Sequence, residues 1–506
     1  MSQSQRTPRR ALPRFSAALL LAVTSGLAVP GRAAPPVTPP MVQSADALPP
    51  VAGSPGAPTG QQIAAAKRDL FTAHPWLGSV MRKAADGFGN VYSAAVANHM
   101  YSRTFAPAID DVRRLTTVVQ EGPRTWLIRM PWVNVAVFET DAGWVLVDSG
   151  YAPAGPVLCE TLRRLSRRPV HTISFTHHHV DHGLGAWALL QAGETPEIIA
   201  EERFITETER DLALQPFFGR MNGQADADHP RSWADLVKPT RTFRERLDIT
   251  VGGERFSLRH ARGESEDQIY VWVPDRKTVV VADYYQVFLP NAGNGRRRQR
   301  QPDEWAVALR DMAGLGAETL LPMHGPAVHG QADIGARLSA HAAMFESVIL
   351  QVKTGLNQRL RKDQIVDGIR LPPELAARTD LLELYVSAKD VAKMVLRQYT
   401  GWWDGIPSHW SPAPLADEAA ALARLAGGAG ALAREALRVL PQDPALAGNL
   451  ADWAFFAAPQ DAEVLRAALQ VYLARLRAAP PLMEATVYFD HAAELAARLR
   501  NADAGT

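Results

Sequence analysis

The stretch TISFTHHHVDHGLGAW, from Thr172 to Trp187, decides the fold of this 506-residue chain. It places four histidines and one aspartate in six consecutive positions, directly after a run of β-branched and aromatic residues. Such a run predicts a strand, and the glycines after it allow the following backbone to pack closely. Imidazole and carboxylate groups crowded at the end of a strand are typical of a metal site. We therefore predict that a metal-binding loop begins here.

The pattern HxHxDH singles out four candidate ligands, which are His177, His179, Asp181 and His182. In an extended strand alternate side chains share a face, so His177 and His179 are expected to reach one cation. The turn that follows then directs Asp181 and His182 at a neighbouring point, so that one loop supplies ligands to two metal ions. His178 points to the opposite face, where we expect a packing or supporting role.

The segments around this loop alternate between strand and helix patterns. Upstream, the apolar runs NVAVFET and WVLVDSG are joined by Asp141-Ala142-Gly143, which predicts a hairpin. A helical segment, LCETLRRLSRR, separates this hairpin from the strand VHTISFTH. A second hairpin is predicted around Pro274 to Lys277, and strand patterns stop after LLPMHG, 320–325. The alternation predicts an α/β layer architecture followed by an all-helical region.

The N-terminus has the pattern of an export signal. Four arginines precede the apolar run FSAALLLAVTSGLAV, Phe15 to Val29, and small residues follow it. The run is too short for a stable membrane anchor, so we predict a signal peptide at 1–33 and a periplasmic or secreted protein without a membrane span. The pair Arg9 and Arg10 also permits the twin-arginine export route.

The rest of the chain divides by composition. A Pro/Gly-rich stretch predicts a linker at 34–62, because it cannot bury enough apolar surface to fold. We predict a catalytic domain at 63–345 and a helical domain at 346–506. The 54 basic and 53 acidic residues nearly cancel, so no global field favours nucleic acid as a partner. Cys159 is the single cysteine, which excludes an intrachain disulfide and a multi-cysteine metal site.

The motif THHHVDHGLG, with Asp148-Ser149-Gly150 at the end of the upstream hairpin, resembles the metallo-β-lactamase superfamily. The resemblance implies an αββα sandwich with a binuclear metal site at one edge, usually containing zinc. It also implies three later ligands. These are Glu264 in the turn HARGESED, Asp283 after the strand TVVV and His324 in LLPMHG. Asp283 takes the position of an acidic residue that bridges the two cations, where negative charge reduces their mutual repulsion.

Glu264 stands where most of the superfamily has a histidine, and this departure resembles the alkyl sulfatase branch. The segment QYTGWWDGIPSHWSPAP, 398–414, is similar to part of the alkyl sulfatase dimerisation domain. This second resemblance implies a homodimer formed through the helical domain. In that branch an asparagine and an arginine hold the sulfate, and Asn291 and Arg296 occupy comparable positions. An arginine suits this role because its planar guanidinium pairs with a tetrahedral oxyanion.

One difference from the branch concerns the proton donor to the leaving group. The branch has a histidine shortly after the arginine, but no histidine lies between His260 and His324 in this chain. Gln301 stands near the expected place and cannot act as an acid at neutral pH. Tyr284 or Tyr285 could replace the histidine, or the substrate could carry a better leaving group.

Taken together, these features favour an exported hydrolase with two divalent metal ions, most simply Zn²⁺. The expected substrate is a small anionic ester, an alkyl sulfate monoester. The metals activate water, and Asp181 and Asp283 are the expected catalytic carboxylates. Metal-assisted chemistry does not itself select the ester, so a lactone, an acyl ester or a phosphate ester is the alternative substrate. A non-catalytic exported binding protein with the same fold is a further alternative.

Overall fold

The computed structural model of the chain describes residues 56–89, 97, 99–101, 107–214, 217 and 230–504. The predicted signal peptide and the linker as far as residue 55 lie outside these residues. The last three residues of the predicted linker instead begin a helix, α1 (Gly60–Ala73). Thr59 caps this helix, because its side chain accepts a hydrogen bond from the backbone amide of Gln62.

In the described part of the chain, seven strands form a first sheet whose spatial order follows the sequence. They are β1 (Thr117–Gly122), β2 (Thr125–Arg129), β3 (Asn134–Glu139), β4 (Trp144–Val147), β5 (Val170–Ser174), β6 (Glu197–Glu201) and β7 (Arg241–Phe243). Neighbours from β1 to β4 are antiparallel, and neighbours from β4 to β7 are parallel. The first predicted hairpin is therefore β3–β4, and helix α6 (Ala154–Leu165) connects β4 to β5 as predicted.

A second, mixed sheet has the order β13-β12-β11-β10-β9-β8. Its strands are β8 (Arg246–Val251), β9 (Glu254–His260), β10 (Ile269–Val273), β11 (Thr278–Val280), β12 (Thr319–Leu321) and β13 (Val328–His329). The second predicted hairpin is β10–β11, with Lys277 in a left-handed conformation at the turn. Helix α11 (Pro302–Ala313) makes the crossover from β11 to the parallel strand β12.

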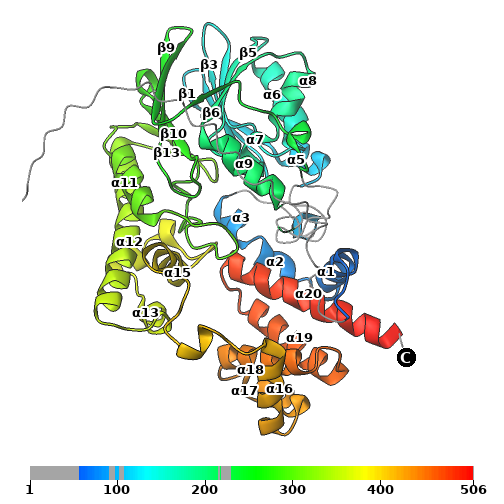
Figure 1. The fold of residues 1–506 in the computed structure, drawn as a ribbon. Helices are drawn as coiled ribbons and strands as arrows, with labels where there is room; N and C mark the ends of the chain where they lie inside the picture. The colour runs from blue at the N-terminus through cyan, green and yellow to red at the C-terminus, as the bar shows by residue number, and fades with distance from the viewer. Residues whose placement is uncertain are drawn as a thin grey trace, which may run out of the picture. The chain divides into compact units, whose positions relative to one another are not determined.

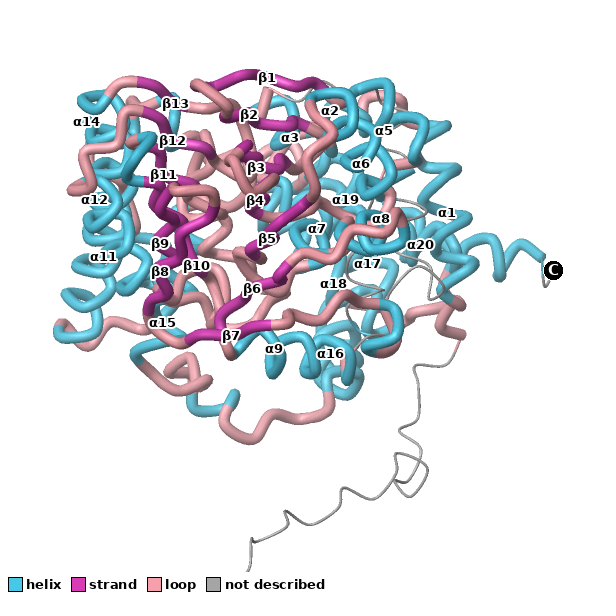
Figure 2. Tube along the Cα trace, turned by 90° about the horizontal axis from the view of Figure 1, so that it is seen from above, coloured by secondary structure: helices cyan, strands magenta, loops and turns pink. Residues whose placement is uncertain are grey.

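The two sheets lie face to face, with α6 and α8 (Ala186–Gln191) outside the first and α11 and α12 (Gln331–Asn357) outside the second (Figure 2). Side chains alternate in direction along the strands and so fill a hydrophobic core on each face of each sheet. Val137 packs in the core under the helices, whereas its neighbour Phe138 packs between the sheets. Val279 and Val280 divide in the same way on the second sheet. The predicted αββα sandwich is confirmed.

The remaining elements near the first sheet are short. They are α5 (Ile109–Leu115), α7 (Val180–Gly183), α9 (Arg203–Ala213), η3 (Trp233–Asp235) and η4 (Pro274–Arg276). Of the two glycines in the motif GLG, only Gly185 is required by packing. A Cβ atom there would lie 2.0 Å from the carbonyl oxygen of Ser149, whereas one at Gly183 would make ordinary contacts with Phe175. Gly185 therefore allows the loop after the histidines to lie against the end of β4.

The chain after the second sheet is helical, as predicted. The helices after α12 are α13 (Lys362–Gly368), α14 (Pro373–Ala376), η5 (Thr379–Leu381), α15 (Ala388–Tyr399), η6 (Pro407–His409), α16 (Leu415–Ala426), α17 (Ala429–Val439), α18 (Pro444–Ala457), α19 (Ala462–Arg477) and α20 (Leu482–Ala504). The predicted domain boundary at residue 345 falls inside α12, which packs against both α11 and α15. This one helix thus belongs to the sandwich and to the helical region.

Helices from the two ends of the chain lie side by side (Figure 1). α1 and α2 (Leu77–Met81) pack against α20, and α3 (Lys83–Gly87) follows α2 directly. The rings of Phe71 and Phe489 meet edge to face at 5.1 Å between centroids. The first helices of the predicted catalytic domain are therefore packed with the last helix of the helical region. No helix among the described residues is long and apolar enough to cross a membrane.

Candidate metal centre

The predicted metal loop begins after the end of β5 rather than within it. β5 ends at Ser174, and His177 and His179 lie in the loop that leads into the short helix α7. The expectation that strand alternation pairs these two histidines is therefore wrong. The loop nevertheless brings the rings together, with 2.8 Å between His177 Nε2 and His179 Nδ1. Asp181 and His182 follow on α7 itself.

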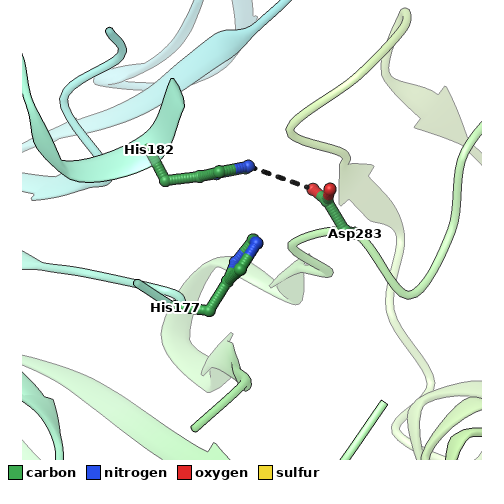
Figure 3. Close-up of side chains that lie close together, drawn as sticks. All are labelled: His177, His182 and Asp283. Carbon is green, nitrogen blue, oxygen red and sulfur yellow. Dashed lines mark ion pairs between the residues drawn. The ribbon is translucent and has the colours of Figure 1, made fainter. Parts of the chain in front are cut away.

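The loop meets side chains from the second sheet. His177, His182 and Asp283 place one ligand atom each within 4.8 Å of one another, and Asp181, His182 and His324 form a second such group. Figure 3 shows the first group, with His182 and Asp283 approaching each other from the two halves of the sandwich. The Asp283 carboxylate lies 3.6 Å from His182 Nε2 and 3.3 Å from His324 Nε2. It therefore lies between the two histidines, as its predicted bridging position requires.

Supporting contacts fix the orientation of these rings. His182 Nδ1 lies 2.8 Å from a carboxylate oxygen of Asp148, and His324 Nδ1 lies 2.6 Å from the carbonyl oxygen of Trp132. Asp148 also accepts hydrogen bonds from the backbone amide and the hydroxyl of Thr176. Both rings thus direct Nε2 at the cluster, in the arrangement that metal-ligating histidines use. The sequence motif Asp-Ser-Gly pointed to Asp148 without revealing this role.

The backbone is strained at two positions that support the cluster. Asp148 has a φ of 64°, and Ala282, directly before Asp283, has a φ of 46°. A left-handed conformation costs a non-glycine residue about 1–2 kcal/mol. Strain at two supporting positions of one cluster is typical of a functional site.

Glu264, the predicted departure from the superfamily pattern, is buried with the cluster. One of its carboxylate oxygens lies 3.7 Å from His179 Nδ1, accepts a hydrogen bond from Asn291 at 2.6 Å and pairs with Arg300 at 3.1 Å. Arg300 also donates to the Glu264 carbonyl oxygen, and its side chain is only 3% exposed. Asn291 was predicted to hold the substrate. In this structure its amide supports Glu264, although Asn291 also lines the adjoining cavity.

Electrostatics in the cluster separate the groups that carry charge from those that do not. Burial, reinforced by the charge of His182, lowers the pKa of His177 well below its usual value. Burial opposes charge on His182 as well, but the carboxylates of Asp283, Asp181 and Asp148 outweigh it and raise that pKa well above the usual value. Burial also opposes charge on Asp283, yet the charges of His324 and His182 hold its pKa well below the usual range.

The remaining groups of the cluster follow the same physics. Burial and the neighbouring imidazoles lower the pKa of His179 well below its usual value. Burial raises the pKa of Glu264 to about 7, although the charge of Arg300 opposes this shift. In the absence of metal the cluster thus holds neutral rings at His177 and His179 beside a protonated His182 and the charged carboxylate of Asp283. Neutral imidazole nitrogens and carboxylate oxygens are the ligand atoms that divalent zinc accepts.

The residues present fit a divalent metal site. Three buried atoms of the cluster have no hydrogen-bond partner among the described residues: His182 Nε2, Glu264 Oε2 and Asp283 Oδ1. Buried polar atoms are nearly always satisfied, and an unsatisfied one costs roughly 1–3 kcal/mol. A cation within reach of these atoms would satisfy one nitrogen and two oxygens at once. All seven predicted ligands, from His177 to His324, lie in or beside the two groups described above.

His178 faces away from this cluster, as predicted for a supporting residue. Its Nδ1 lies 2.9 Å from Asp267, and its Nε2 lies 3.6 Å from Asp211. Burial opposes charge on this ring, but the two carboxylates together raise its pKa to about 9. His178 is therefore a buried cation that contacts two carboxylates and supports the loop on the side away from the metal cluster.

The cluster opens into a cavity of about 100 Å³. Its wall includes the ligands His179, Asp181, Glu264, Asp283 and His324, together with Phe88, Trp132, Asn291, Arg296, Tyr385, Phe489 and Asp490. Part of the wall thus comes from helices that no sequence pattern placed at this site. Lys67 of α1 and Asp490 of α20 meet in it, with 2.7 Å between Nζ and Oδ1.

The structure contradicts the suggestion that Tyr284 or Tyr285 donates the leaving-group proton. The hydroxyl of Tyr284 is bound to the carbonyl oxygens of Ala261 and Gln268, and Tyr285 packs against His341. Neither residue lines the cavity. Both side chains instead pack into the hydrophobic core between the second sheet and its helices. Tyrosines that do reach the cavity are Tyr101 and Tyr385.

Comparison with known proteins agrees with this geometry. Residues 133–324 match the metallo-beta-lactamase superfamily, and residues 361–498 match the alkyl sulfatase dimerisation family. With the sandwich and the ligand cluster at its edge, the first match defines a metallo-beta-lactamase domain at these residues. The second match covers most of the helical region, which is thus similar to the alkyl sulfatase dimerisation domain. Both predicted resemblances are confirmed.

Two curated alkylsulfatases are similar to this chain. A linear primary-alkylsulfatase of Pseudomonas sp. is 28% identical over 320 residues, which cover 58% of this chain and 60% of that protein. An alkyl/aryl-sulfatase of Saccharomyces cerevisiae is 23% identical over 336 residues, which cover 60% of this chain and 52% of that protein. The chain thus spans 60% or less of the length of each of these relatives.

A solved structure shows the same fold across most of the chain. The stereoselective inverting sec-alkylsulfatase Pisa1 from Pseudomonas sp. superposes with a TM-score of 0.68 at 17% sequence identity. The superposition covers 86% of this chain and 77% of that one. The sandwich and the helical region therefore occur in one arrangement in both proteins.

Proposed function

We propose that this protein hydrolyses organic sulfate monoesters, with an alkyl sulfate as the substrate class. The observation that carries the proposal is the place of Glu264, a carboxylate buried in the ligand cluster beside His179. Asn291 and Arg296, at positions comparable to the sulfate-binding pair of the branch, line the cavity next to it. The alkylsulfatase relatives support the same substrate class.

We propose that the cluster holds two divalent cations, with zinc as the metal. His177, His179 and Glu264 would hold one of them, Asp181, His182 and His324 would hold the other, and Asp283 lies between the two sets. Two such cations supply an activated water and polarise a substrate oxygen at neutral pH. Of these ligands, His179 comes from the loop after β5, and Glu264 comes from the turn after β9.

The protein's own side chains orient the substrate and handle protons. The guanidinium of Arg296 and the amide of Asn291 lie on the cavity wall, where they can hold the sulfate oxygens. The carboxylates of Asp181 and Asp283 face the same cavity and can orient the attacking water and accept its proton. Tyr385 lines the same cavity, so its hydroxyl can donate a proton to the leaving oxygen.

A substrate panel tests the proposal. Purified protein loaded with Zn²⁺ should release inorganic sulfate from dodecyl sulfate and from shorter alkyl sulfates, and a chelator should abolish the release. A lactone, an acyl ester and a phosphate ester belong in the same panel, because metal-assisted hydrolysis alone does not distinguish them. Cleavage of one of those esters without any release of sulfate would contradict the proposed substrate class.

We also propose that the protein is a homodimer and that it is exported. The match of 361–498 to the dimerisation family supports the dimer, and light scattering coupled to size exclusion measures it directly. The arginine-rich start and the apolar run from Phe15 to Val29 support export to the periplasm or the medium. N-terminal sequencing of protein recovered outside the cytoplasm should find a new terminus near residue 34.

A further inference from the structure

A buried lysine lies on the cavity that the metal ligands line. Lys67, on α1, is 4% exposed, and its ammonium is 2.7 Å from Oδ1 of Asp490 on α20. The second oxygen of the same carboxylate is 2.7 Å from Nη1 of Arg296. One aspartate thus forms ion pairs with two cationic side chains, and all three residues line the cavity. We call them the Lys67–Asp490–Arg296 cluster.

The charge balance of Lys67 points to an anion. A lysine is rarely this buried unless a counter-charge or a ligand compensates for its lost hydration. Within the described residues, Asp490 is the one carboxylate within 4.0 Å of the Lys67 ammonium, and Asp490 also serves Arg296. The ring of Phe489, 5.8 Å away, adds only weak cation–π stabilisation. Lys67 therefore keeps part of a positive charge that faces the cavity.

Helix packing, rather than a sequence motif, brings Lys67 to this place. The residue lies outside both segments that match known families, 133–324 and 361–498. α1 reaches the cavity because it packs along α20, where Phe71, four residues after Lys67, meets Phe489, the residue directly before Asp490. The lysine is thus a contribution of the N-terminal helix to a site whose metal ligands all lie on the sandwich.

We propose that Lys67 is a second cationic residue of the substrate site and binds the sulfate group beside Arg296, with Asp490 positioning both cations. The identity of the anion rests on the proposed function. A lysine contributes a point charge to tetrahedral oxyanions, which complements the directional hydrogen bonds of an arginine. The apolar side chains of Met81, Phe88 and Phe489 line the same cavity and provide contacts for the carbon chain.

A second ion pair between the same helices provides a matched control. Asp69 of α1 pairs with Arg500 of α20, but their side chains are 61% and 46% exposed and neither residue lines the cavity. If the contact of Lys67 with Asp490 only joined the two helices, its loss should resemble the loss of this exposed pair. An anion-binding role predicts a different result.

The experiment is a calorimetric titration of the full-length, Zn²⁺-loaded protein with sodium sulfate at low ionic strength. Lys67→Met removes the ammonium and keeps an apolar stem, and it should weaken sulfate binding by about tenfold or more. Lys67→Arg keeps the charge and should bind within about threefold of the wild type. Asp69→Asn should bind sulfate as the wild type does. With an alkyl sulfate substrate, Lys67→Met should raise KM while changing kcat much less.

Sulfate binding by folded Lys67→Met with the wild-type Kd would overturn the proposal and leave Lys67 a structural residue. Should Lys67→Met fail to fold by circular dichroism, Lys67→Gln is titrated in its place, with the same expected loss. The two proposals fail separately. If the wild type binds sulfate through Lys67 but cleaves no organic sulfate, the anion site stands and the proposed function falls. If the wild type is a sulfatase and Lys67→Met is unaffected, the proposed function stands and the proposed anion site falls.

Discussion

Two parts of one cavity wall are built in different ways. The metal ligands lie between His177 and His324, on loops and on the short helix α7 of the sandwich, and the rings of His182 and His324 are each oriented by a nearby partner. The Lys67–Asp490–Arg296 cluster joins α1, a loop of the sandwich and α20. Lys67 and Asp490 stand near opposite ends of the chain. The metal ligands thus all come from the sandwich, four of them from one short motif, whereas two of the three proposed recognition residues come from helices packed against each other.

The largest expected effect is at the metal ligands. Asp283→Ala removes the carboxylate that lies between His182 and His324, so both cations should be held less tightly. Hydrolysis should fall about a thousandfold or more, because the metals supply several kcal/mol of transition-state stabilisation. Metal content per chain should fall with it. Asp275→Ala, which alters an exposed aspartate paired with Arg255, is the control and should keep full activity and metal content.

A smaller effect is expected at Asp148, which contacts the metal ligand His182 but is not itself a predicted ligand. Asp148→Asn replaces the carboxylate that orients His182 but keeps a side chain of the same size. Loss of such a supporting carboxylate typically lowers metal affinity or activity by about 10- to 100-fold. Competition with a chromophoric chelator measures the affinity. Wild-type affinity in this variant would show that Asp148 only supports the backbone at the end of β4.

The pH dependence of binding should distinguish the metal ligands from the Lys67–Asp490–Arg296 cluster. Carboxylates raise the pKa values of buried His182 and His324, although burial opposes this. Without metal these rings stay protonated near neutral pH. Their charge stabilises the metal-free fold below the unfolded pKa of about 6.5, and this stability is lost as pH rises through the folded values.

Metal must displace these protons, so its affinity should rise about tenfold per pH unit for each proton released. Calorimetry at pH 7 in buffers of different ionisation enthalpy should show the release of at least one proton per chain. An affinity that does not change with pH would contradict this electrostatic description. Sulfate binding at the Lys67–Asp490–Arg296 cluster should vary much less over the same range, because this cluster contains no histidine.

The sequence predicted the metal part of the wall for a physical reason. His177, His179, Asp181 and His182 are close in the chain, so a loop of any plausible shape brings them together. The distant ligands could be placed because they follow strands of the second sheet, whose ends meet at one edge. The αββα architecture followed from strand and helix alternation together with the resemblance. The extent of β5 did not, because β-branched and aromatic residues continue past Ser174, the last residue of this strand.

The rest of the wall depends on packing that no local pattern reveals. The run RRRQR, 296–300, contains four arginines that look alike in sequence. In the structure Arg300 is buried against Glu264, whereas Arg296 pairs with Asp490. Lys67 lies in an ordinary amphipathic helix, and only the contact of α1 with α20 brings it to the cavity. Burial, which decides the role of each charge, is a property of the assembled fold.

The most direct test of the central claim is anomalous diffraction at the zinc edge from crystals of the Zn²⁺-loaded protein. We predict two peaks per chain, one beside His177, His179 and Glu264 and the other beside Asp181, His182 and His324, with Asp283 between them. Loss of both peaks in Asp283→Ala crystals with an unchanged fold would strengthen the assignment. A single peak, or peaks only at other residues, would contradict the binuclear centre on which the proposed hydrolysis depends.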